Sequence, residues 1–341
     1  MPTIYIRDPD TTLAVDSSYF TLRSHGRRIG RIPPTMVEQV IVEHGVEITR
    51  IALDRLGTMG IPVTFLGREG RVQARLVAPW KPKPHMRLGQ AAAHFDPSVR
   101  QQLARRWVDA KIANSITVLR KYLSNYKDER LSEIIRDLGG FRDRVFETDN
   151  LPWLLGVEGS AARLWFEALG HMLRTPWLTF SGRNRRPPRD PGNAVLSYSY
   201  AVLSHQILAC TEAVGLDPYI GYLHQPDDRR PALVMDLLEP FRPALGDRLM
   251  LRLLNLGTLK QEHFHEPEGA ANGVRICPEG RAAVLNVLVE WVNVCDDTLG
   301  RDQPSPGGLM LREVERFAKH ATAGTLAEFI PYHLDPDEIR N

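Results

Sequence analysis

The sequence has few cysteines and no long apolar run. Its 341 residues contain only three cysteines, Cys210, Cys277 and Cys295, and none forms a C-x-x-C pair. This argues against a disulfide scaffold or a zinc–thiolate site and favours a reducing compartment. No apolar stretch approaches the roughly 18 residues that a spanning helix needs, and the N-terminal residues lack the pattern of a secretory signal. We therefore expect a globular protein of the cytoplasm without a membrane segment.

Several common catalytic motifs are also missing. The sequence has no G-x-S-x-G elbow, no P-loop and no G-x-G-x-x-G turn that opens a helix after a strand. Nothing therefore predicts an activated nucleophile or a nucleotide-binding loop. Any chemistry has to come from polar residues that lie within otherwise apolar segments.

Net charge is close to zero, but the cations are clustered. The chain has 43 lysines and arginines against 41 acids, a formal charge of +2. Lysine and arginine exceed the acids in three stretches, residues 68–87, 100–130 and 181–190. Such clustering fits an anionic partner that is held on one surface. Charge alone leaves a second interpretation open, in which these residues are simply solvated helix faces.

The first 80 residues have the pattern of a small β domain. Short β-type segments, spaced by roughly ten residues and bounded by glycine, proline, aspartate or serine, indicate a sandwich rather than alternating βαβ units. One short helix is expected where an apolar stripe from Ile51 to Met59 ends at Gly60-Ile61-Pro62. The expected strands are Thr12–Val15, Thr21–Arg23, Gln39–Val42, Ile48–Thr49, Val63–Phe65 and Val72–Leu76.

The pattern changes after a segment rich in proline and lysine. From residue 97 onward, apolar residues recur at helical spacing, and glycine or proline separates most of the stretches. The expected helices are 97–126, 129–146, 153–173, 193–214, 231–241, 243–255, 278–297 and 308–330. We predict an α+β fold, with a β-sandwich-like domain over residues 1–80, a linker over 81–96 and a larger all-α-helical domain over 97–341.

Four polar residues stand out within this helical part. Glu158 lies between two glycines, His224 precedes a turn, and Asp236 and Glu239 are three residues apart on one helical face. One imidazole with two or three carboxylates is a ligand set for Mg²⁺ or Mn²⁺, and such an ion can act as a Lewis acid on a phosphodiester. Each residue also has a plain interpretation, as a helix-start glutamate, an exposed or capping histidine, or a solvated acidic face.

Four sequence blocks resemble a known family. GVEGSAARLWF (156–166), GNAVLSYSYAVLSHQI (192–207), GYLHQPDDRRPALVMDLLEPFRP (221–243) and LLNLGTLKQEHF (253–264) are similar to the signature blocks of the CRISPR-associated integrase, the Cas-one family. They occur in that family's order and approximate spacing. Residues 40–76 and 87–122 are similar as well, so the resemblance covers nearly the whole chain.

The resemblance implies roles for individual residues. It assigns Glu158, His224 and Glu239 as catalytic residues that bind Mg²⁺ or Mn²⁺, with Asp236 as an auxiliary carboxylate. The third ligand is aspartate in some members of the family, and glutamate keeps the charge and donor type.

Three further residues match family blocks near the site. Asn193 and Tyr200 lie in a block that approaches the DNA end, and Arg242 fits a cation beside the transferring phosphate. Asn193 has helix capping, and Tyr200 core packing, as an alternative role.

The resemblance also implies DNA contacts and partners. Phosphate contacts of this kind are largely independent of sequence and sensitive to salt. The predicted DNA-binding residues are Arg183, Arg185, Arg186, Arg189, Lys81, Lys83 and Arg87. The expected partners are double-stranded DNA (protospacer fragments and the CRISPR leader-repeat), a second copy in a homodimer, and a small Cas-two companion that completes a heterohexamer. Some systems of this family add an end-processing nuclease of the Cas-four family.

The expected reaction is spacer acquisition. A free 3′-hydroxyl of a captured DNA fragment attacks a phosphodiester of the CRISPR repeat in a metal-dependent transesterification. No covalent enzyme intermediate is needed, which agrees with the missing nucleophile motifs. Two alternatives stay open, a transposon-type integrase on the same fold and a catalytically silent scaffold that holds DNA ends.

Overall fold

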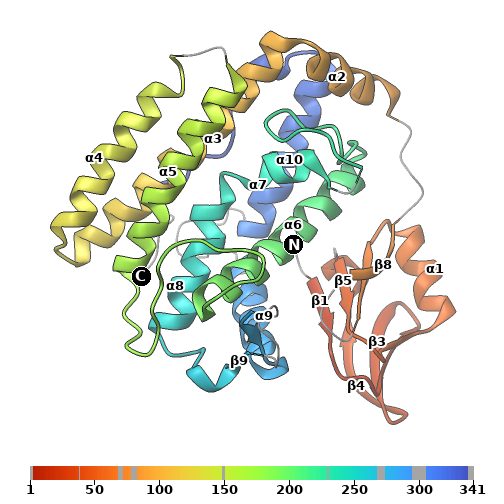
Figure 1. The fold of residues 1–341 in the computed structure, drawn as a ribbon. Coiled ribbons are helices and arrows are strands. Elements are labelled where there is room, and N and C mark those ends of the chain that lie inside the picture. The colour runs from red at the N-terminus through yellow and green to blue at the C-terminus, as the bar shows by residue number, and fades with distance from the viewer. Residues whose placement is uncertain are drawn as a thin grey trace. The chain divides into compact units, whose positions relative to one another are not determined.

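The computed structural model describes residues 3–37, 39–67, 72–77, 83–147, 150–228, 230–266, 273–293 and 305–336. The chain divides into two compact units. The first comprises residues 1–83 with 209–216 and 289–311, and the second comprises residues 84–208, 217–288 and 312–341. Strands dominate the first unit and helices the second (Figure 1), which confirms the predicted α+β fold class.

Two four-stranded sheets build the first unit. One sheet has the order β1-β5-β7-β8, with β1, β5 and β7 parallel and β8 antiparallel to β7. The other has the order β4-β3-β2-β6, with antiparallel pairs except for the parallel pair of β2 and β6. The strands are β1 (Thr3–Ile6), β2 (Thr11–Asp16), β3 (Tyr19–Ser24), β4 (Arg27–Ile32), β5 (Gln39–Val42), β6 (Glu47–Ile48), β7 (Val63–Leu66) and β8 (Val72–Leu76).

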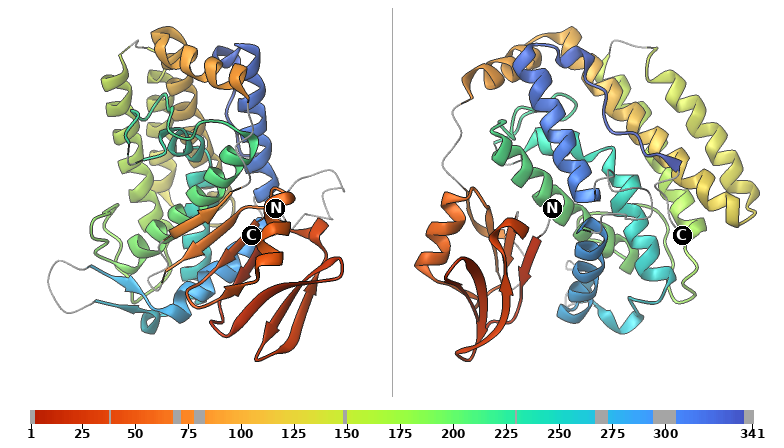
Figure 2. Two further views of the ribbon diagram at one scale, coloured as in Figure 1. Left: turned by 90° about the vertical axis from the view of Figure 1, so that its right-hand side faces the viewer. Right: turned by 180° about the vertical axis from the view of Figure 1, so that it is seen from behind.

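Both sheets and one helix share a single apolar core. Leu13 and Phe20 come from the second sheet, Val40 and Val63 from the first, and Leu56 from α1 (Arg50–Thr58), and all are fully buried. Burial of such aliphatic and aromatic side chains is the main stabilising contribution to a small β unit. Because α1 connects parallel strands β5 and β7, the unit contains one strand–helix–strand crossover that the sequence pattern did not indicate (Figure 2).

The sequence pattern also missed two strands of this unit. β1 is short and lies at the start of the described chain. β4 has the sequence RRIGRI, and none of its residues is buried. An edge strand of this kind lacks the alternation of buried and exposed residues by which strands are recognised.

The second unit is a helical assembly in which α3, α4 and α5 pack side by side (Figure 1). Its helices begin at the predicted breaks, and Asp96, Asp128 and Asn150 cap the first turns of these three helices. The helices are α2 (Pro84–Phe95), α3 (Pro97–Asn125), α4 (Glu129–Arg144), α5 (Leu151–Met172), α6 (Pro191–Val214), α7 (Ala232–Leu238), α8 (Arg248–Asn255), α9 (Pro278–Asn293) and α10 (Pro306–Ala323), of which α6, α9 and α10 extend into the first unit. A short strand pair, β9 (Phe264–His265) and β10 (Arg275–Ile276), also lies in this unit.

The predicted linker 81–96 is helical over most of its length. After Pro84, residues Met86, Gln90 and Ala93 recur at helical spacing on the buried face of α2. Proline suits the first turn of a helix because that turn leaves its backbone N–H groups unpaired anyway. The proline- and lysine-rich start of the segment masks this periodicity.

The segment between α7 and α8 departs from regular α-helix. After α7 ends at Leu238, residues Arg242–Asp247 form a π-helical turn that leads into α8. Such turns are rare and occur frequently at functional sites. In the parts of the chain that the structure describes, no helix is both long and apolar enough to cross a membrane.

Candidate active site

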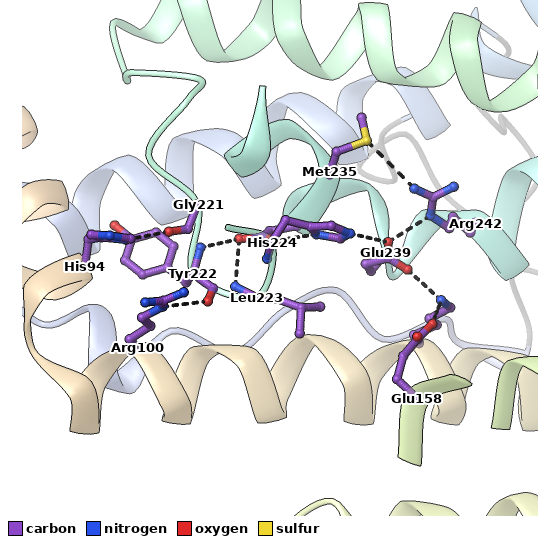
Figure 3. A network of polar contacts seen from close by, with 12 residues as sticks. His94, Arg100, Glu158, Gly221, Tyr222, Leu223, His224, Met235, Glu239 and Arg242 are labelled. Atoms are coloured by element: carbon purple, nitrogen blue, oxygen red, sulfur yellow. Dashed lines mark hydrogen bonds and ion pairs between the residues drawn. The ribbon is translucent and has the colours of Figure 1, made fainter. Parts of the chain in front are cut away.

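Three elements of the helical unit bring the predicted ligands together (Figure 3). Glu158 projects from α5, His224 ends the segment after Gly221, and Glu239 follows the last turn of α7. His224 Nε2 lies 3.9 Å from Glu239 Oε1. Lys111 of α3 contacts Glu158 and lies with its Nζ 2.8 Å from Glu239 Oε2. The ammonium group of Lys111 therefore links the two carboxylates.

Asp236 holds the backbone before His224. Its Oδ2 accepts hydrogen bonds from the backbone N–H groups of Tyr222 (2.6 Å) and Leu223 (3.2 Å). Its Oδ1 accepts from the backbone N–H of His224 at 2.9 Å and from His224 Nδ1 at 2.7 Å. Asp236 is fully buried, and burial raises its pKa although these hydrogen bonds oppose the shift. This carboxylate positions the histidine.

The contact with Asp236 also sets the chemistry of the His224 ring. Because Nδ1 donates to the carboxylate, Nε2 on the side of Glu239 keeps its lone pair in the neutral imidazole. Burial lowers the pKa of His224, but Asp236 and Glu239 together raise it above the usual value. The histidine is thus oriented to bind a cation or accept a proton at Nε2.

Gly221 is required where the histidine segment passes α7. A Cβ atom there would lie 2.6 Å from Ala232 Cβ and 2.7 Å from the carbonyl oxygen of His224. We expect Gly221→Ala to lower the free energy of unfolding by about 1–3 kcal/mol, because the clash displaces this segment. Urea denaturation measures the change. Gly139→Ala is the control, because nothing lies within 4 Å of a Cβ at that helical position, and this variant should be neutral or slightly stabilising.

Glu239 lies next to more positively charged or chargeable side chains than any other carboxylate of the cluster. Its Oε1 accepts a hydrogen bond from Arg242 Nε at 3.0 Å, and only 6% of its side chain is exposed. Burial alone would raise its pKa, but Arg242, Lys111 and His224 lower the pKa of Glu239 to about 2. Burial likewise opposes the charge of Lys111, yet Glu239 and Glu158 raise the pKa of Lys111. Both partners are therefore ionised at neutral pH.

The donor set of this cluster fits Mg²⁺ or Mn²⁺ in chemistry. A carboxylate held in its ionised form and an imidazole nitrogen with a free lone pair suit these ions, and a cation, Lys111, already stands between Glu158 and Glu239. Among the described residues, no group of three or more histidine, cysteine or acidic side chains is arranged as a complete metal site. A metal ion bound between Glu158 and Glu239 would compete with Lys111 for their carboxylate oxygens.

A buried polar network supports Arg242 from behind. The guanidinium carbon of Arg242 lies 4.6 Å from the ring centre of Tyr200, whose hydroxyl donates to Asp247 Oδ1. Trp165 Nε1 donates to Asp247 Oδ2 at 2.7 Å, and burial raises the pKa of Asp247 to about 6. Tyr200 therefore packs against Arg242. The tyrosine is both a buried core residue and a neighbour of the site.

Asn193 secures the loop that precedes α6. Its Nδ2 donates to the carbonyl of Gly182 (2.8 Å), and its Oδ1 accepts from Arg183 (2.8 Å) and from the backbone N–H of Asn184 (3.0 Å). Asp190, not Asn193, accepts the backbone N–H at the start of the helix. Arg183 was predicted to contact phosphate. In the structure it is half-buried and donates hydrogen bonds within the loop.

The other predicted DNA-binding residues differ in accessibility. Arg185, Arg186 and Arg189 are exposed on this loop, and Lys83 is exposed before α2. Arg87 is half-buried, and Lys81 lies outside the described residues.

Many basic side chains of the stretch 100–130 contact other groups within the protein. Arg100 and Arg106 donate to backbone carbonyls, Lys111 contacts the site carboxylates, and Arg130 pairs with two glutamates. Arg120 and Lys127 remain exposed, while part of the 68–87 stretch, including Arg68 and Arg71, lies outside the described residues. Fewer basic side chains are therefore available to an anionic partner than the positive charge of the sequence suggests.

A cavity of about 860 Å³ lies along the face of α5 that continues from Glu158. Small residues next to the glutamate form part of its wall, and two arginines reach it from the helix and the loop. Its lining residues are Gly159, Ala162, Arg163, Phe166, Glu167, Gly170, His171, Phe180, Ser181, Gly182 and Arg183.

Two residues of the cluster escaped the sequence analysis as site residues. Lys111 lies on the side of α3 that carries Trp107 and Ser115, and Asp247 lies among buried apolar residues before α8. Both are charged residues within a buried helical stripe. This pattern could have indicated them as site residues, because a buried charge needs a partner.

The fold matches solved structures of CAS1 proteins and of a casposase. A CAS1 protein from Thermotoga maritima superposes with a TM-score of 0.76 at 24% identity, covering 94% of this chain and 96% of that one. A Cas6-RT-Cas1–Cas2 complex matches with a TM-score of 0.76 at 21% identity over 97% of this chain and 36% of that one. A casposase bound to integration product matches with a TM-score of 0.77 at 20% identity, covering 100% of this chain and 96% of that one. These likenesses define the fold class, a strand-rich unit followed by the helical unit of the CAS1 type.

Sequence comparison narrows the class to one family. The family described as "CRISPR associated protein Cas1" matches residues 4–290, and the chain belongs to this family. It is 33% identical over 304 residues to the CRISPR-associated endonuclease Cas1 2 of Rhodospirillum rubrum, covering 84% of this chain and 85% of that one. It is 31% identical to the endonuclease Cas1 1 of Moorella thermoacetica over 97% of both chains. An exonuclease Cas4/endonuclease Cas1 fusion of Geobacter sulfurreducens is 33% identical over 79% of this chain and 49% of the fusion.

Proposed function

We propose that this Cas1 protein is a divalent-metal-dependent DNA integrase and endonuclease of CRISPR adaptation. It joins the 3′-hydroxyl ends of short DNA fragments to the CRISPR repeat by transesterification. The observation that carries the proposal is the ionised, buried Glu239, which lies beside His224 Nε2 and shares a cation with Glu158. The names of the relatives as Cas1 endonucleases support the same reaction class.

In this proposal Glu158, His224 and Glu239 hold Mg²⁺ or Mn²⁺. When bound, such an ion supplies Lewis acidity to a phosphodiester and favours the deprotonated form of an attacking hydroxyl. Asp236 keeps the His224 ring turned so that Nε2 remains a donor to the ion. Arg242 stays beside Glu239 and contributes positive charge where the transferred phosphate becomes more negative.

Lys111 has a separate role in the same proposal. Without a metal ion, its ammonium neutralises Glu158 and Glu239 and prevents two partly buried carboxylates from repelling each other. Its release from one of them accompanies metal binding.

The cavity beside Glu158 is a candidate channel for the DNA strand that reaches the site. The exposed Arg163 can contact phosphates there, and Phe166 and Phe180 offer faces for base stacking. The exposed Arg185, Arg186 and Arg189 extend positive charge along the adjoining loop. Lys81, Lys83 and Arg87 are proposed as further phosphate contacts.

The proposed assembly is that of a cytoplasmic adaptation complex. A homodimer would hold the two ends of a protospacer, and a Cas2 companion would complete a heterohexamer. The similar Cas6-RT-Cas1–Cas2 complex and the Cas4/Cas1 fusion support Cas2 and a Cas4 nuclease as partners.

A transposon-type integrase is the second candidate, favoured by the casposase match over the whole chain. The two differ in the DNA that they join and in the target. A Cas1 protein of CRISPR adaptation accepts short duplexes of unrelated sequence and inserts them at a leader-repeat junction, whereas a transposon-type enzyme requires its own element ends.

The experiment that tests the function is strand joining in vitro. A short duplex with 3′-hydroxyl ends is incubated with a supercoiled plasmid that carries a leader and a repeat, together with the cognate Cas2 companion. We expect joined product with Mn²⁺ and none with EDTA, with Glu158→Gln or with His224→Ala. Metal-independent joining, or full joining by Glu158→Gln, would refute the proposal.

A further inference from the structure

The backbone that follows Glu239 lacks two hydrogen-bond donors. In the sequence Glu239-Pro240-Phe241-Arg242-Pro243, neither proline carries a backbone N–H. Pro243 stands where an α-helix would supply the donor for the carbonyl of Glu239. The backbone N–H of Arg242 donates to that carbonyl instead, at 3.3 Å. Contacts from other elements are therefore needed to fix the course of the backbone next to this carboxylate.

Asn114 of α3 supplies one such contact. Its Nδ2 donates to the carbonyl of Pro240 at 2.9 Å, and only 1% of the residue is exposed. Asn114 lies three residues after Lys111, so the two share a face of α3. From that face, Lys111 contacts the side chain of Glu239, with Nζ 2.8 Å from Oε2. α3 thus contacts both the carboxylate of Glu239 and the backbone carbonyl of the next residue.

The same side-chain amide binds a segment from the far end of the sequence. After α10 the chain returns along α3 (Figure 2), and we call residues 330–334 the C-terminal strap. Asn114 Nδ2 also donates to the carbonyl of Tyr332 at 3.2 Å, and Asn114 Oδ1 accepts from the backbone N–H of Leu334 at 2.8 Å. An asparagine side chain offers two N–H donors and one carbonyl acceptor. Asn114 uses all of them to join the strap to the backbone after Glu239.

An aromatic stack makes a second contact between the strap and this backbone. The rings of Tyr332 and Phe241 are stacked, with their centroids 4.9 Å apart and their planes 9° apart, and Phe241 is buried. The strap is itself held by α10. Glu313 Oε1 accepts from the backbone N–H of Tyr332 at 2.7 Å, and Arg316 donates to the carbonyl of Ile330 at 2.7 Å. The strap is therefore a fixed support rather than a loose end beside the site.

We propose that Asn114 is a positioning residue for metal binding by Glu239, and that the C-terminal strap supports it in this role. The amide acts through the carbonyl of Pro240, and the stack acts through Phe241. A shift of this backbone would move the Glu239 carboxylate away from His224 Nε2, which lies 3.9 Å from its Oε1. Groups that orient a metal ligand are worth about 10- to 100-fold in metal affinity. The inference rests on the proposed function in taking Glu239 as a ligand.

The test compares Mn²⁺ affinity with stability, because a purely structural role would change only stability. Mn²⁺ binding to the purified wild type and to Asn114→Asp is followed by electron paramagnetic resonance. Aspartate keeps an acceptor for the backbone N–H of Leu334 but turns a second acceptor toward the carbonyls of Pro240 and Tyr332. We expect the dissociation constant for Mn²⁺ to rise at least about tenfold.

Leu131→Ala is the control for lost stability. Leu131 is fully buried in the first turn of α4, and its truncation leaves a cavity away from the carboxylate cluster. This variant should lower the melting temperature and keep the wild-type affinity for Mn²⁺. Equal Mn²⁺ affinities of the wild type and Asn114→Asp, or an equal loss of affinity in Leu131→Ala, would overturn the inference.

Tyr332 provides a pair of variants that leave Asn114 in place. Tyr332→Leu removes the ring that stacks on Phe241, and Tyr332→Phe keeps it. We expect weaker Mn²⁺ binding by the leucine variant and wild-type affinity for the phenylalanine variant. This pair tests the inference even where Asn114→Asp does not fold. Wild-type affinity in both variants would contradict the role of the strap.

Hydrogen exchange of the metal-free protein separates this inference from the proposed function. In EDTA, peptides that cover residues 236–247 should exchange faster in Asn114→Asp than in the wild type and in Leu131→Ala. If exchange rises in this way but the wild type binds no Mn²⁺, Asn114 still positions Glu239 and the proposed metal site fails. If Glu239→Gln weakens Mn²⁺ binding while Asn114→Asp changes neither binding nor exchange, only the positioning inference fails.

Discussion

Replacing Asp236 with alanine is expected to lower strand joining by about 100-fold and the free energy of unfolding by about 3 kcal/mol or more. The alanine would leave two buried backbone N–H groups, the partly buried backbone N–H of His224 and the Nδ1 of His224 without their acceptor. The histidine segment would lose its anchor, and the ring would lose its fixed orientation. Urea denaturation and the joining assay measure the two effects.

The conservative variant Asp236→Asn separates orientation from overall stability. Asparagine keeps one acceptor oxygen of similar position, so we expect it to recover part of the unfolding free energy. It turns an amide N–H₂ toward other donors, and the half-saturating Mn²⁺ concentration for joining should therefore still rise. If both variants retain wild-type Mn²⁺ dependence, Asp236 does not position His224.

Replacing Lys111 with methionine is expected to destabilise the metal-free protein much more than the metal-bound protein. Methionine keeps the length of the side chain but removes the charge that links Glu158 and Glu239. Removing one partner of a buried ion pair costs about 3–5 kcal/mol, and Arg242 compensates only part of the charge left on Glu239. A bound Mn²⁺ would restore that compensation, so the loss should shrink when the metal is present.

The measurement is the melting temperature with EDTA and with saturating Mn²⁺. Lys121→Met serves as the control, because it removes a lysine of the same helix whose side chain is not part of the carboxylate cluster. This control should show the same small change in both conditions. A Lys111→Met protein with equal losses in EDTA and Mn²⁺ would contradict the role given to Lys111.

The local sequence pattern predicted most of the helices and strands but missed those whose composition is unusual for their type, such as β4 and α2. The strands with apolar alternation and the long helices lie close to their expected bounds, because their core residues repeat with the period of the element. β4 was missed because arginines occupy an edge strand, and α2 was missed because its start is rich in proline and lysine. The arginines that obscured β4 suit an exposed edge strand, and the proline that obscured α2 suits the first turn of a helix.

The candidate site was only partly predictable for a different reason. The residue chemistry and the family blocks both indicated Glu158, His224 and Glu239 as ligands, and the spacing of Asp236 and Glu239 predicted a shared helical face. Both carboxylates lie beside the His224 ring, Asp236 at Nδ1 and Glu239 at Nε2, and Glu239 also accepts a hydrogen bond from Arg242. Lys111 is separated from Glu158 by 47 residues and from Glu239 by many more, and no local pattern reports a contact made through tertiary packing.

Binding of Mn²⁺ to the purified protein, followed by electron paramagnetic resonance, tests the central claim most directly. We expect a Mn²⁺ site in the wild type that Glu158→Gln, His224→Ala and Glu239→Gln each weaken at least about tenfold, while Gly139→Ala leaves it unchanged. Equal Mn²⁺ affinity in the wild type and in all three site variants would show that this cluster does not hold the metal ion.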